Sequence, residues 1–316
     1  MAYKVSGKVV LITGPARGIG EATARLLAAR GARLALVGLE PERLAALAAE
    51  LGEGHAWFEC DVTDQAALER AVAGTVERLG GIDVVVANAG VASHGTAAVT
   101  PVEALVRTVE VNLVGVVRTV CATLPHVTER RGYYLLVSSA AAIAPMPGLS
   151  TYAAAKSGVE QFGNVLRLEL AHKGVQVGVA HPSWIDTDLV RDARRDIGSF
   201  DELLKKLPPP FGTVTPVEEC AAAFVRAVER RRRKVFVPRA LAPFAAVRGL
   251  LASPLSERIA GLRARRFVPA AEREVASLGR PFGASSMGMG ARASDDDAQS
   301  ADAPPDHATP HTASSP

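Results

Sequence analysis

The chain has 316 residues, of which 48% are hydrophobic and 22% charged, and its formal net charge is +3. This composition is typical of a soluble globular protein with a substantial core, and so small a charge gives no reason to expect a nucleic-acid partner. The three cysteines have no metal or redox spacing and no apolar run is long enough to span a bilayer, so we expect a cytoplasmic protein without a metal site.

The N-terminal part reads as a strand, a glycine turn and a helix. An apolar run over 8–13 leads into Gly14, Gly18 and Gly20, and an amphipathic segment follows over 21–30. Glycines with this spacing let the backbone approach a pyrophosphate and direct the N-terminal amides of a helix at it. An ordinary turn followed by a helix cap is the alternative at this point.

Strand-like and helix-like segments alternate beyond the glycine turn. Further strands are predicted over 33–39, 55–62, 83–87, 133–137, 175–180 and 234–238, and helices over 41–51, 64–79, 101–123 and 216–232. This alternation favours an α/β fold in which a parallel sheet carries helices on both faces.

The end of the second strand bears on the choice of nucleotide. In a dinucleotide fold an acidic residue there binds the ribose 2′-hydroxyl of NAD, whereas a basic one accommodates the 2′-phosphate of NADP. Gly38 occupies the selecting position here, and Glu40 either contacts a ribose or opens the next helix. Arg17 could meet a phosphate, so the residues leave NAD and NADP both open.

Tyr152 and Lys156 form the central pair of the predicted site. They stand four residues apart in an alanine-rich run, which places both side chains on one face of a helix. A nearby ammonium favours a phenolate, so the phenol proton becomes transferable near neutral pH. Ser139 follows the strand over 133–137, where its hydroxyl could bind a substrate oxygen. We predict that the three residues form one site.

Other polar side chains are less informative when each is taken by itself. Asn88 begins an Asn-Ala-Gly sequence at a strand end, which suits a turn or the close passage of a ligand. Asn112 lies in apolar surroundings, and alone it reads best as a core asparagine with satisfied hydrogen bonds. Four histidines without metal-ligand spacing are predicted to be ordinary surface or loop residues: His94, His126, His172 and His181.

The C-terminal third departs from the alternating pattern. Residues 191–211 are charged and then proline-rich, which is typical of a mobile lid. One nucleotide-binding domain over 1–238 is followed by a basic, apolar extension over 239–282 that we expect to be helical. Its segment 241–268 could pack on the domain, on a partner subunit or peripherally on a membrane. Residues 283–316 are poor in apolar side chains and predict a disordered tail.

Taken in order, these motifs resemble the short-chain dehydrogenase/reductase family over about residues 5–238. The resemblance rests on T-G-P-A-R-G-I-G, the pair Asp61-Val62, N-A-G at Asn88, Asn112, Ser139 and Tyr-A-A-A-Lys. It implies a single-domain, doubly wound Rossmann sheet of seven strands. It also implies reversible hydride transfer between NAD or NADP and a secondary alcohol or ketone, and assembly into a homo-dimer or tetramer.

The resemblance also assigns roles to individual residues. Tyr152 would be the general acid in reduction and the base in oxidation, and Ser139 would orient the substrate oxygen. Lys156 would hold the nicotinamide ribose and lower the pKa of Tyr152, while Asn112 would position a water that links Lys156 to solvent. The implied cofactor-binding residues are Gly14, Arg17, Gly18, Ile19, Gly20, Asp61, Val62, Asn88, Ala89, Gly90, Tyr152, Lys156, Pro182, Ile185 and Thr187.

Two departures from the family pattern stand out, and one alternative function remains. The family has Pro-Gly where this chain has Pro182-Ser183, and nothing after 238 matches a shared motif.

Apolar or small residues over 91–99 and 140–149 favour an apolar substrate over a sugar. The alternative is a non-catalytic nucleotide-binding regulatory or scaffold protein of the same fold, although such a protein would be expected to lose Ser139, Tyr152 or Lys156.

Overall fold

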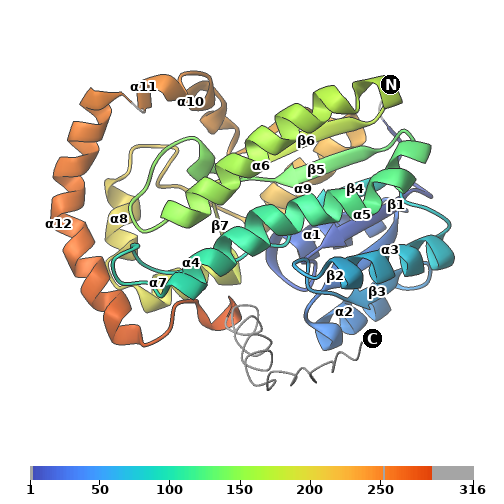
Figure 1. Ribbon diagram of the computed structural model, residues 1–316, viewed down its shortest axis with the longest axis horizontal. Helices are drawn as coiled ribbons and strands as arrows, with labels where there is room; N and C mark the ends of the chain where they lie inside the picture. The colour runs from blue at the N-terminus through green and yellow to red at the C-terminus, as the bar shows by residue number, and fades with distance from the viewer. Residues whose placement is uncertain (1–2, 252, 287–316) are drawn as a thin grey trace, which may run out of the picture.

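The computed structural model describes residues 3–251 and 253–286, and a parallel sheet forms its centre (Figure 1). In spatial order its strands are β3 (Ala56–Glu59), β2 (Arg33–Gly38), β1 (Val9–Thr13), β4 (Val84–Ala87), β5 (Tyr133–Val137), β6 (Gln176–Pro182) and β9 (Lys234–Val237). All neighbouring strands are parallel. The predicted seven-stranded Rossmann sheet is confirmed.

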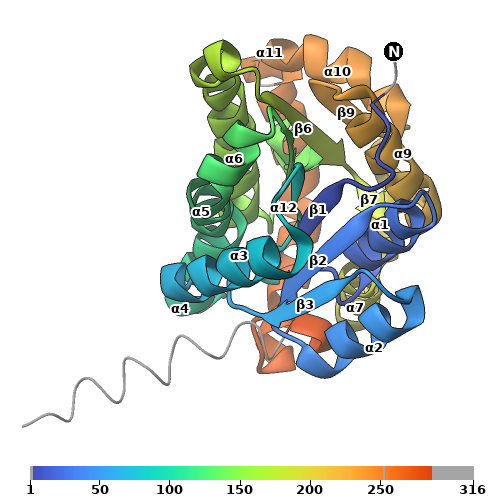
Figure 2. The same ribbon diagram turned by 90° about the vertical axis from the view of Figure 1, so that its right-hand side faces the viewer.

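Helices cover both faces of this sheet, as Figure 2 shows. One layer consists of α1 (Gly18–Ala28), α2 (Pro41–Leu51) and α9 (Val217–Arg230), and the other of α3 (Gln65–Leu79), α4 (Val102–Val109), α5 (Gly115–Glu129) and α6 (Ser150–Glu169). The central strands β1, β4 and β5 are buried along their whole length because both of their faces lie under helices. Two apolar cores therefore hold the sheet in place.

The sheet order fixes where a ligand can bind. The chain runs outward from β1 through β2 to β3, and then returns to place β4 on the other side of β1. The loops after β1 and β4 diverge at this reversal, so a crevice opens at the carboxyl ends of the two strands. The glycine turn and Asn88 follow these two strands, which puts both motifs at the crevice.

The predicted lid over 191–211 is largely helical. It holds most of α7 (Asp188–Asp196) and all of α8 (Phe200–Lys206), and it is flanked by β7 (Trp184–Ile185) and β8 (Val214–Thr215), which pair in a small parallel sheet. The sequence did not predict this pair, because two-residue strands carry no periodicity. From here on we call the whole segment 184–215 the lid. After β9 the chain forms a short 3-10 turn (Arg239–Leu241), α10 (Ala242–Ala246), α11 (Arg248–Leu251) and the long α12 (Pro254–Leu278). Figure 1 shows α12 running alongside α8 at one end of the molecule.

The segment after α12 packs on the domain. Phe282 forms an isolated bridge with Ser93, and the backbone N–H of Ser285 donates to the Asp192 carboxylate at 2.6 Å. Ser286 is buried at the end of a 3-10 turn (Ala284–Ser286). Residues 283–286 thus belong to the fold, contrary to the predicted tail, and 287–316 lie outside the described residues. Within the described part of the chain, no helix has the length and apolar character needed to cross a bilayer.

Two of the four histidines are buried. The prediction of a surface or loop position is wrong for His181, which lies on a strand, whereas His94 lies in the loop that follows β4. His181 on β6 is completely buried and stacks on the Phe236 ring with a centroid separation of 4.9 Å. His94 is only 7% exposed and lies 3.5 Å from Asp196. Their partners come from distant parts of the chain, which explains why the local sequence did not reveal the burial.

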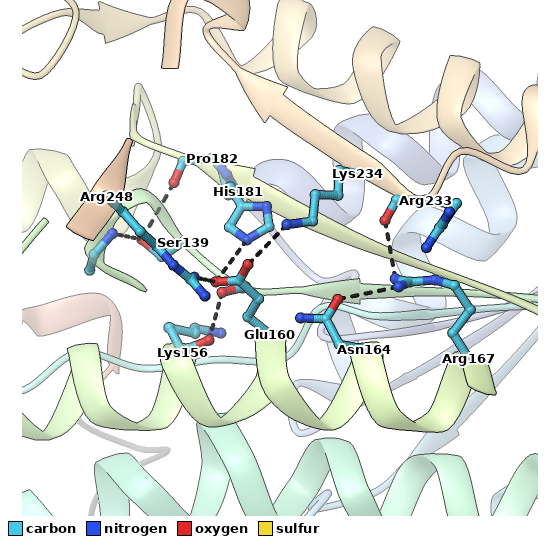
Figure 3. Close-up of polar contacts among 12 residues, drawn as sticks. Ser139, Lys156, Glu160, Asn164, Arg167, His181, Pro182, Arg233, Lys234 and Arg248 are labelled. Carbon is cyan, nitrogen blue, oxygen red and sulfur yellow. Dashed lines mark hydrogen bonds and ion pairs between the residues drawn. The ribbon is translucent and has the colours of Figure 1, made fainter. Parts of the chain in front are cut away.

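His181 belongs to a cluster of charges around Glu160 on α6 (Figure 3). The buried Glu160 carboxylate lies 2.8 Å from Arg248, 3.3 Å from Lys234 and 3.6 Å from His181. The close approach of His181 and the two nearby cations lower the pKa of Glu160 to about 2, against the opposing effect of burial. Since Arg248 begins α11, this cluster fastens the C-terminal extension to the helix that carries Tyr152 and Lys156.

We expect Glu160→Gln to destabilise the protein in a pH-dependent way. The folded pKa lies below the ordinary value of 4.5, so the carboxylate stabilises the fold above about pH 4.5 and this contribution is lost as the pH falls toward 2. Urea titrations should show a loss of roughly 2 kcal/mol in the free energy of unfolding at neutral pH. The loss should shrink by about pH 3.

The exposed pair of Glu202 and Lys206 on α8 provides the control. Glu202→Gln should leave the free energy of unfolding unchanged within about 0.5 kcal/mol, because exposed ion pairs contribute little. A loss in Glu160→Gln that is the same at both pH values would contradict the role assigned to the carboxylate.

Candidate active site

The glycine turn between β1 and α1 is too tightly packed for larger residues. Gly14 has a φ of 65°, and a Cβ there would lie 2.9 Å from the Cα of Ala89. A Cβ on Gly20 would lie 2.7 Å from the Asn88 amide nitrogen and would overlap the carbonyl oxygen of Gly14. Because α1 begins at Gly18, the turn presents the free N–H groups of a helix N-terminus to the crevice.

Asn88 ties the end of β4 to the end of β1. Its side-chain amide donates to the carbonyl oxygens of Thr13 at 3.1 Å and Gly14 at 3.0 Å. The backbone N–H groups of Asn88 and Ala89 both donate to the hydroxyl of Thr13, at 3.0 and 3.1 Å. The two loops that border the crevice are therefore held at a fixed spacing.

Asp61 lies at the far end of the cleft, beyond β3. Its carboxylate accepts hydrogen bonds from the N–H and hydroxyl of Thr63, both at 2.8 Å, and from Arg107 at 2.6 Å. Burial opposes ionisation, but these hydrogen bonds hold the pKa of Asp61 below its usual range. Arg107 on α4 is 4% exposed and lines the cleft. The sequence did not predict this position, because an arginine in an amphipathic helix is usually a surface residue.

Glu40 and Arg17 meet where the ribose would be read. Arg17 hydrogen-bonds Glu40 through two nitrogens, and its guanidinium lies 3.5 Å from Asp188. Glu40 also directly precedes α2, so it both opens the helix and lines the cleft. Gly38 lines the cleft as well but brings no charge. The part of the cleft that would distinguish NAD from NADP thus contains the Glu40 carboxylate, and the Arg17 guanidinium beside it is already paired with Glu40 and Asp188.

Tyr152 and Lys156 lie on one face of α6, close to Ser139 beyond β5. Lys156 is buried, its Nζ lies 5.7 Å from the centre of the Tyr152 ring, and it donates to the carbonyl of Val137 at 2.9 Å. Burial lowers the pKa of Lys156 to about 7. The Ser138 hydroxyl donates to the Lys156 carbonyl at 2.7 Å, which fixes the helix to the end of β5.

The pKa of Tyr152 differs from the expectation that Lys156 lowers it. Burial raises the pKa of Tyr152, and the hydrogen bond with Ser139 offsets only part of that rise. Burial also lowers the pKa of Lys156 to about 7, so only part of the Lys156 population carries a positive charge near neutral pH. In this site the phenol is therefore held protonated.

Asn112 lies in a π-helical turn (Glu110–Val114) between α4 and α5, and such turns are frequent at functional sites. Its amide donates to the carbonyls of Val91 at 2.6 Å and Thr108 at 2.8 Å. Its Oδ1 is buried without a hydrogen-bond partner among the described residues, and a Cβ on Gly90 would come within 2.7 Å of it. A core asparagine would be fully bonded, so this free oxygen favours a functional role.

The predicted site residues converge on one cleft. All of them except Gly20 and Ser139 line it, and Ser139 shares an adjoining pocket with Tyr152. The cleft also takes in Ser285 and Ser286 from the C-terminal segment, which no motif had indicated. No group of side chains suited to hold a metal ion occurs in the described part of the chain.

Glycines that admit close approach, free helix N–H groups and the free oxygen of Asn112 together fit a bound dinucleotide. Its pyrophosphate would meet the glycine turn, and its nicotinamide ribose would meet Tyr152 and Lys156. The residues around Ile185 and Thr187 border the same end of the cleft. The cleft is therefore suited to a nicotinamide dinucleotide.

Comparisons with known proteins agree with this geometry. Residues 8–198 match the family model for short chain dehydrogenases. The 2,3-dihydro-2,3-dihydroxybenzoate dehydrogenase of Bacillus subtilis is 34% identical over 224 residues, 70% of this chain and 86% of that protein. The glycine betaine reductase ATRR of Emericella nidulans is 34% identical over 231 residues, 72% of this chain, but the chain spans only 18% of that protein. A short-chain type dehydrogenase/reductase from Mycobacterium marinum superposes with a TM-score of 0.65 at 26% identity, covering 72% of this chain and 90% of that one.

We expect Gly20→Ala to impair nucleotide binding. The added methyl would displace Asn88 or the Gly14 carbonyl, and either shift disturbs the turn that approaches the pyrophosphate. Fluorescence titration with NADH and NADPH should show affinity lowered by at least about tenfold, equivalent to ~1.4 kcal/mol.

Gly249→Ala in α11 is the control, since a Cβ there meets nothing within 4 Å. This variant should bind both nucleotides as the wild type does. Wild-type affinity in Gly20→Ala would show that the turn does not hold the pyrophosphate.

Proposed function

The chain belongs to the short-chain dehydrogenase/reductase family, and we propose that it interconverts an apolar ketone and the matching secondary alcohol. As a member it is an NAD(P)-dependent oxidoreductase that acts on CH–OH groups. One observation carries the choice of an apolar substrate: Tyr152 and Ser139 face a pocket whose other walls are mostly apolar or small. Those walls are Ala92, Ala140, Ala141, Ala144, Met146, Leu149, Ser183, Trp184, Leu189, Val190 and Phe211.

In the proposed reaction, two hydroxyl groups hold the substrate oxygen. Ser139 donates a hydrogen bond that orients the carbonyl, and Tyr152 donates the proton that the oxygen acquires on reduction. The bound nicotinamide supplies or accepts the hydride at the carbon. Tyr152 is protonated at neutral pH and so has a proton to donate. Its raised pKa makes it a weaker acid than a free phenol, so the transfer requires negative charge to develop on the substrate oxygen.

Lys156 and Asn112 restore the proton in this scheme. With a pKa of about 7, Lys156 can return a proton to the phenolate and take one from solvent at similar free-energy cost. The free Oδ1 of Asn112 would hold a water at the start of that path. In oxidation the same groups move the proton in the opposite direction. The convergence of Ser139, Tyr152 and Lys156 favours this chemistry over a non-catalytic scaffold.

We further propose that the enzyme prefers NAD. Glu40 places a carboxylate at the ribose end of the cleft, where it can bind a 2′-hydroxyl and would repel a 2′-phosphate. Arg17, the residue best placed to bind that phosphate, is engaged by Glu40 and Asp188. The pairing of Arg17 supports NAD, whereas the sequence left the choice open.

A homo-dimer is a separate proposal, and apolar side chains on two helices support it. Val102 and Val106 on α4 are 62% and 50% exposed, and Leu168 on α6 is 74% exposed. Helices α4 and α6 pack against each other, and exposed large apolar residues on such neighbouring helices are typical of subunit contacts. The helices that bear Asn112 and Tyr152 would then pack against a second copy of the chain.

We expect Tyr152→Phe to abolish most of the turnover while most of the nucleotide affinity is retained, because the glycine turn and Lys156 still hold the dinucleotide. Loss of a general acid typically lowers kcat by about 10²–10⁴-fold. Assays with NADH or NADPH and a panel of apolar ketones would measure kcat, and fluorescence titration would measure nucleotide affinity. Tyr3→Phe, far from the cleft, is the control for the same chemical change. Equal turnover by Tyr152→Phe and wild type would refute the mechanism.

We expect Glu40→Gln to shift nucleotide preference toward NADPH. The change removes the charge that repels a 2′-phosphate and weakens the hold on Arg17, so the ratio of the two dissociation constants should move by about tenfold. Glu42→Gln, exposed on the first turn of α2, is the matched control and should leave the ratio unchanged. An unchanged ratio in Glu40→Gln would remove the proposed selection.

A further inference from the structure

A second cavity lies between the lid and α12, next to the Tyr152 pocket. It encloses about 920 Å³ of space between its walls, part of which is open to solvent. The lid contributes Trp184, Val190, Phe200 and Leu203, and Met146 and Leu149 come from the segment that precedes α6. We call this cavity the chamber.

The outer wall of the chamber is one face of α12. Phe267, Val268, Ala271 and Val275 recur at intervals of one, three and four residues, which places them along a single stripe of the helix, and all four line the chamber. Arg273, Ala276 and Ser277 on the same helix are exposed. The apolar face of the extension is thus turned toward the chamber in this stretch.

The chamber adjoins the pocket that contains Tyr152 and Ser139. Six residues line both: Ala92, Met146, Leu149, Trp184, Leu189 and Val190. The tail of a substrate whose oxygen lies at Tyr152 would pass along these shared side chains to reach the chamber.

Polar groups at the rim of the chamber are bonded within the protein. Glu272 accepts from the Thr96 hydroxyl at 2.6 Å, and Glu274 accepts from the Ser199 hydroxyl at 3.0 Å. His94 directs its Nε2 toward Asp196, which is not part of the lining, and burial lowers the pKa of His94 so that it stays neutral. Asp192, the other carboxylate of the lining, is paired with Arg195 at 2.5 Å. A ligand in the chamber thus meets mainly apolar side chains.

The same contacts hold α12 in place over the chamber. Glu272 and Glu274 join it to the segment after β4 and to the lid. Beyond the helix, Arg280 lies 2.6 Å from Asp196, and the N–H of His94 donates to the carbonyl of Pro281 at 2.8 Å. The wall is therefore a built part of the substrate site, and its shape limits what the chamber admits.

We propose that the chamber binds an uncharged apolar tail of the substrate and that α12, at Ala271 above all, determines how long a tail is accepted. The proposal rests on the proposed function, because it assumes a carbonyl at Tyr152. Ala271 is the smallest of the four side chains on the lining stripe of α12, so a larger residue there would fill space that a tail occupies. Tail length is thereby read by a helix that lies outside the family's shared motifs.

The test compares Ala271→Phe with Ala276→Phe on the methyl ketones 2-butanone, 2-octanone and 2-dodecanone, with NADH or NADPH. In the wild type kcat/KM should rise with tail length by up to about fourfold per methylene, which corresponds to ~0.8 kcal/mol for each CH₂ removed from water. Ala271→Phe should lower the ratio of kcat/KM for 2-dodecanone to that for 2-butanone by at least about tenfold. It should leave 2-butanone within about twofold of wild type.

Ala276→Phe places the same ring on the exposed side of α12 and should keep both values within about twofold of wild type. An unchanged ratio in Ala271→Phe, or an equal loss in both variants, would overturn the proposal. Binding is followed separately, in the Tyr152→Phe background, by the effect of 2-dodecanone on the fluorescence of Trp184 in the chamber wall. If Ala271→Phe weakens 2-dodecanone binding but the wild type turns over none of the ketones, the proposed reaction is refuted and the role of the chamber is retained. If the wild type turns over the ketones with no dependence on tail length, the role of the chamber is refuted and the proposed reaction is retained.

Discussion

The hydrogen bonds of Asn88 set the spacing on which both halves of the site depend. By donating to the carbonyls of Thr13 and Gly14, the amide holds the glycine turn against the end of β4. The turn then has no room for a Cβ at Gly20, and its helix N-terminus faces the crevice. Two residues further along, Gly90 passes so close to the Oδ1 of Asn112 that the nucleotide side and the proton path share one backbone segment.

Helix α6 arranges three titratable groups at successive turns, and their surroundings give them different states. Lys156 is buried and Tyr152 is half-buried beside hydroxyl and carbonyl groups, and this desolvation raises the pKa of the phenol and lowers that of the ammonium to about 7. Glu160 lies among three basic side chains, and its pKa falls to about 2. The first two can exchange protons near neutral pH, while the third stays charged and serves as an anchor.

Local sequence predicted the parts of the site that depend on spacing within one element. The interval from Tyr152 to Lys156 and the glycines at the start of α1 are of this kind, and the structure brings them to one cleft. The burial of His181 and the role of Arg107 could not be predicted, because each depends on partners far away in the chain. The same holds for the direction of the Tyr152 pKa, since neighbouring charge is visible in a sequence whereas desolvation is a property of the packed site.

The C-terminal extension forms the part of the site that is separate from the chemistry at Tyr152. Arg248 attaches its beginning to Glu160, one turn beyond Lys156, and the contacts of Glu272 and Arg280 attach its later part beside the lid. Because both ends are fixed to the domain, α12 can present an apolar face to the chamber without collapsing into it. The motifs around Tyr152 account for the transfer of a proton, but they do not determine which substrate binds. Substrate choice then lies with side chains such as Ala271, which can vary without disturbing the chemistry at Tyr152.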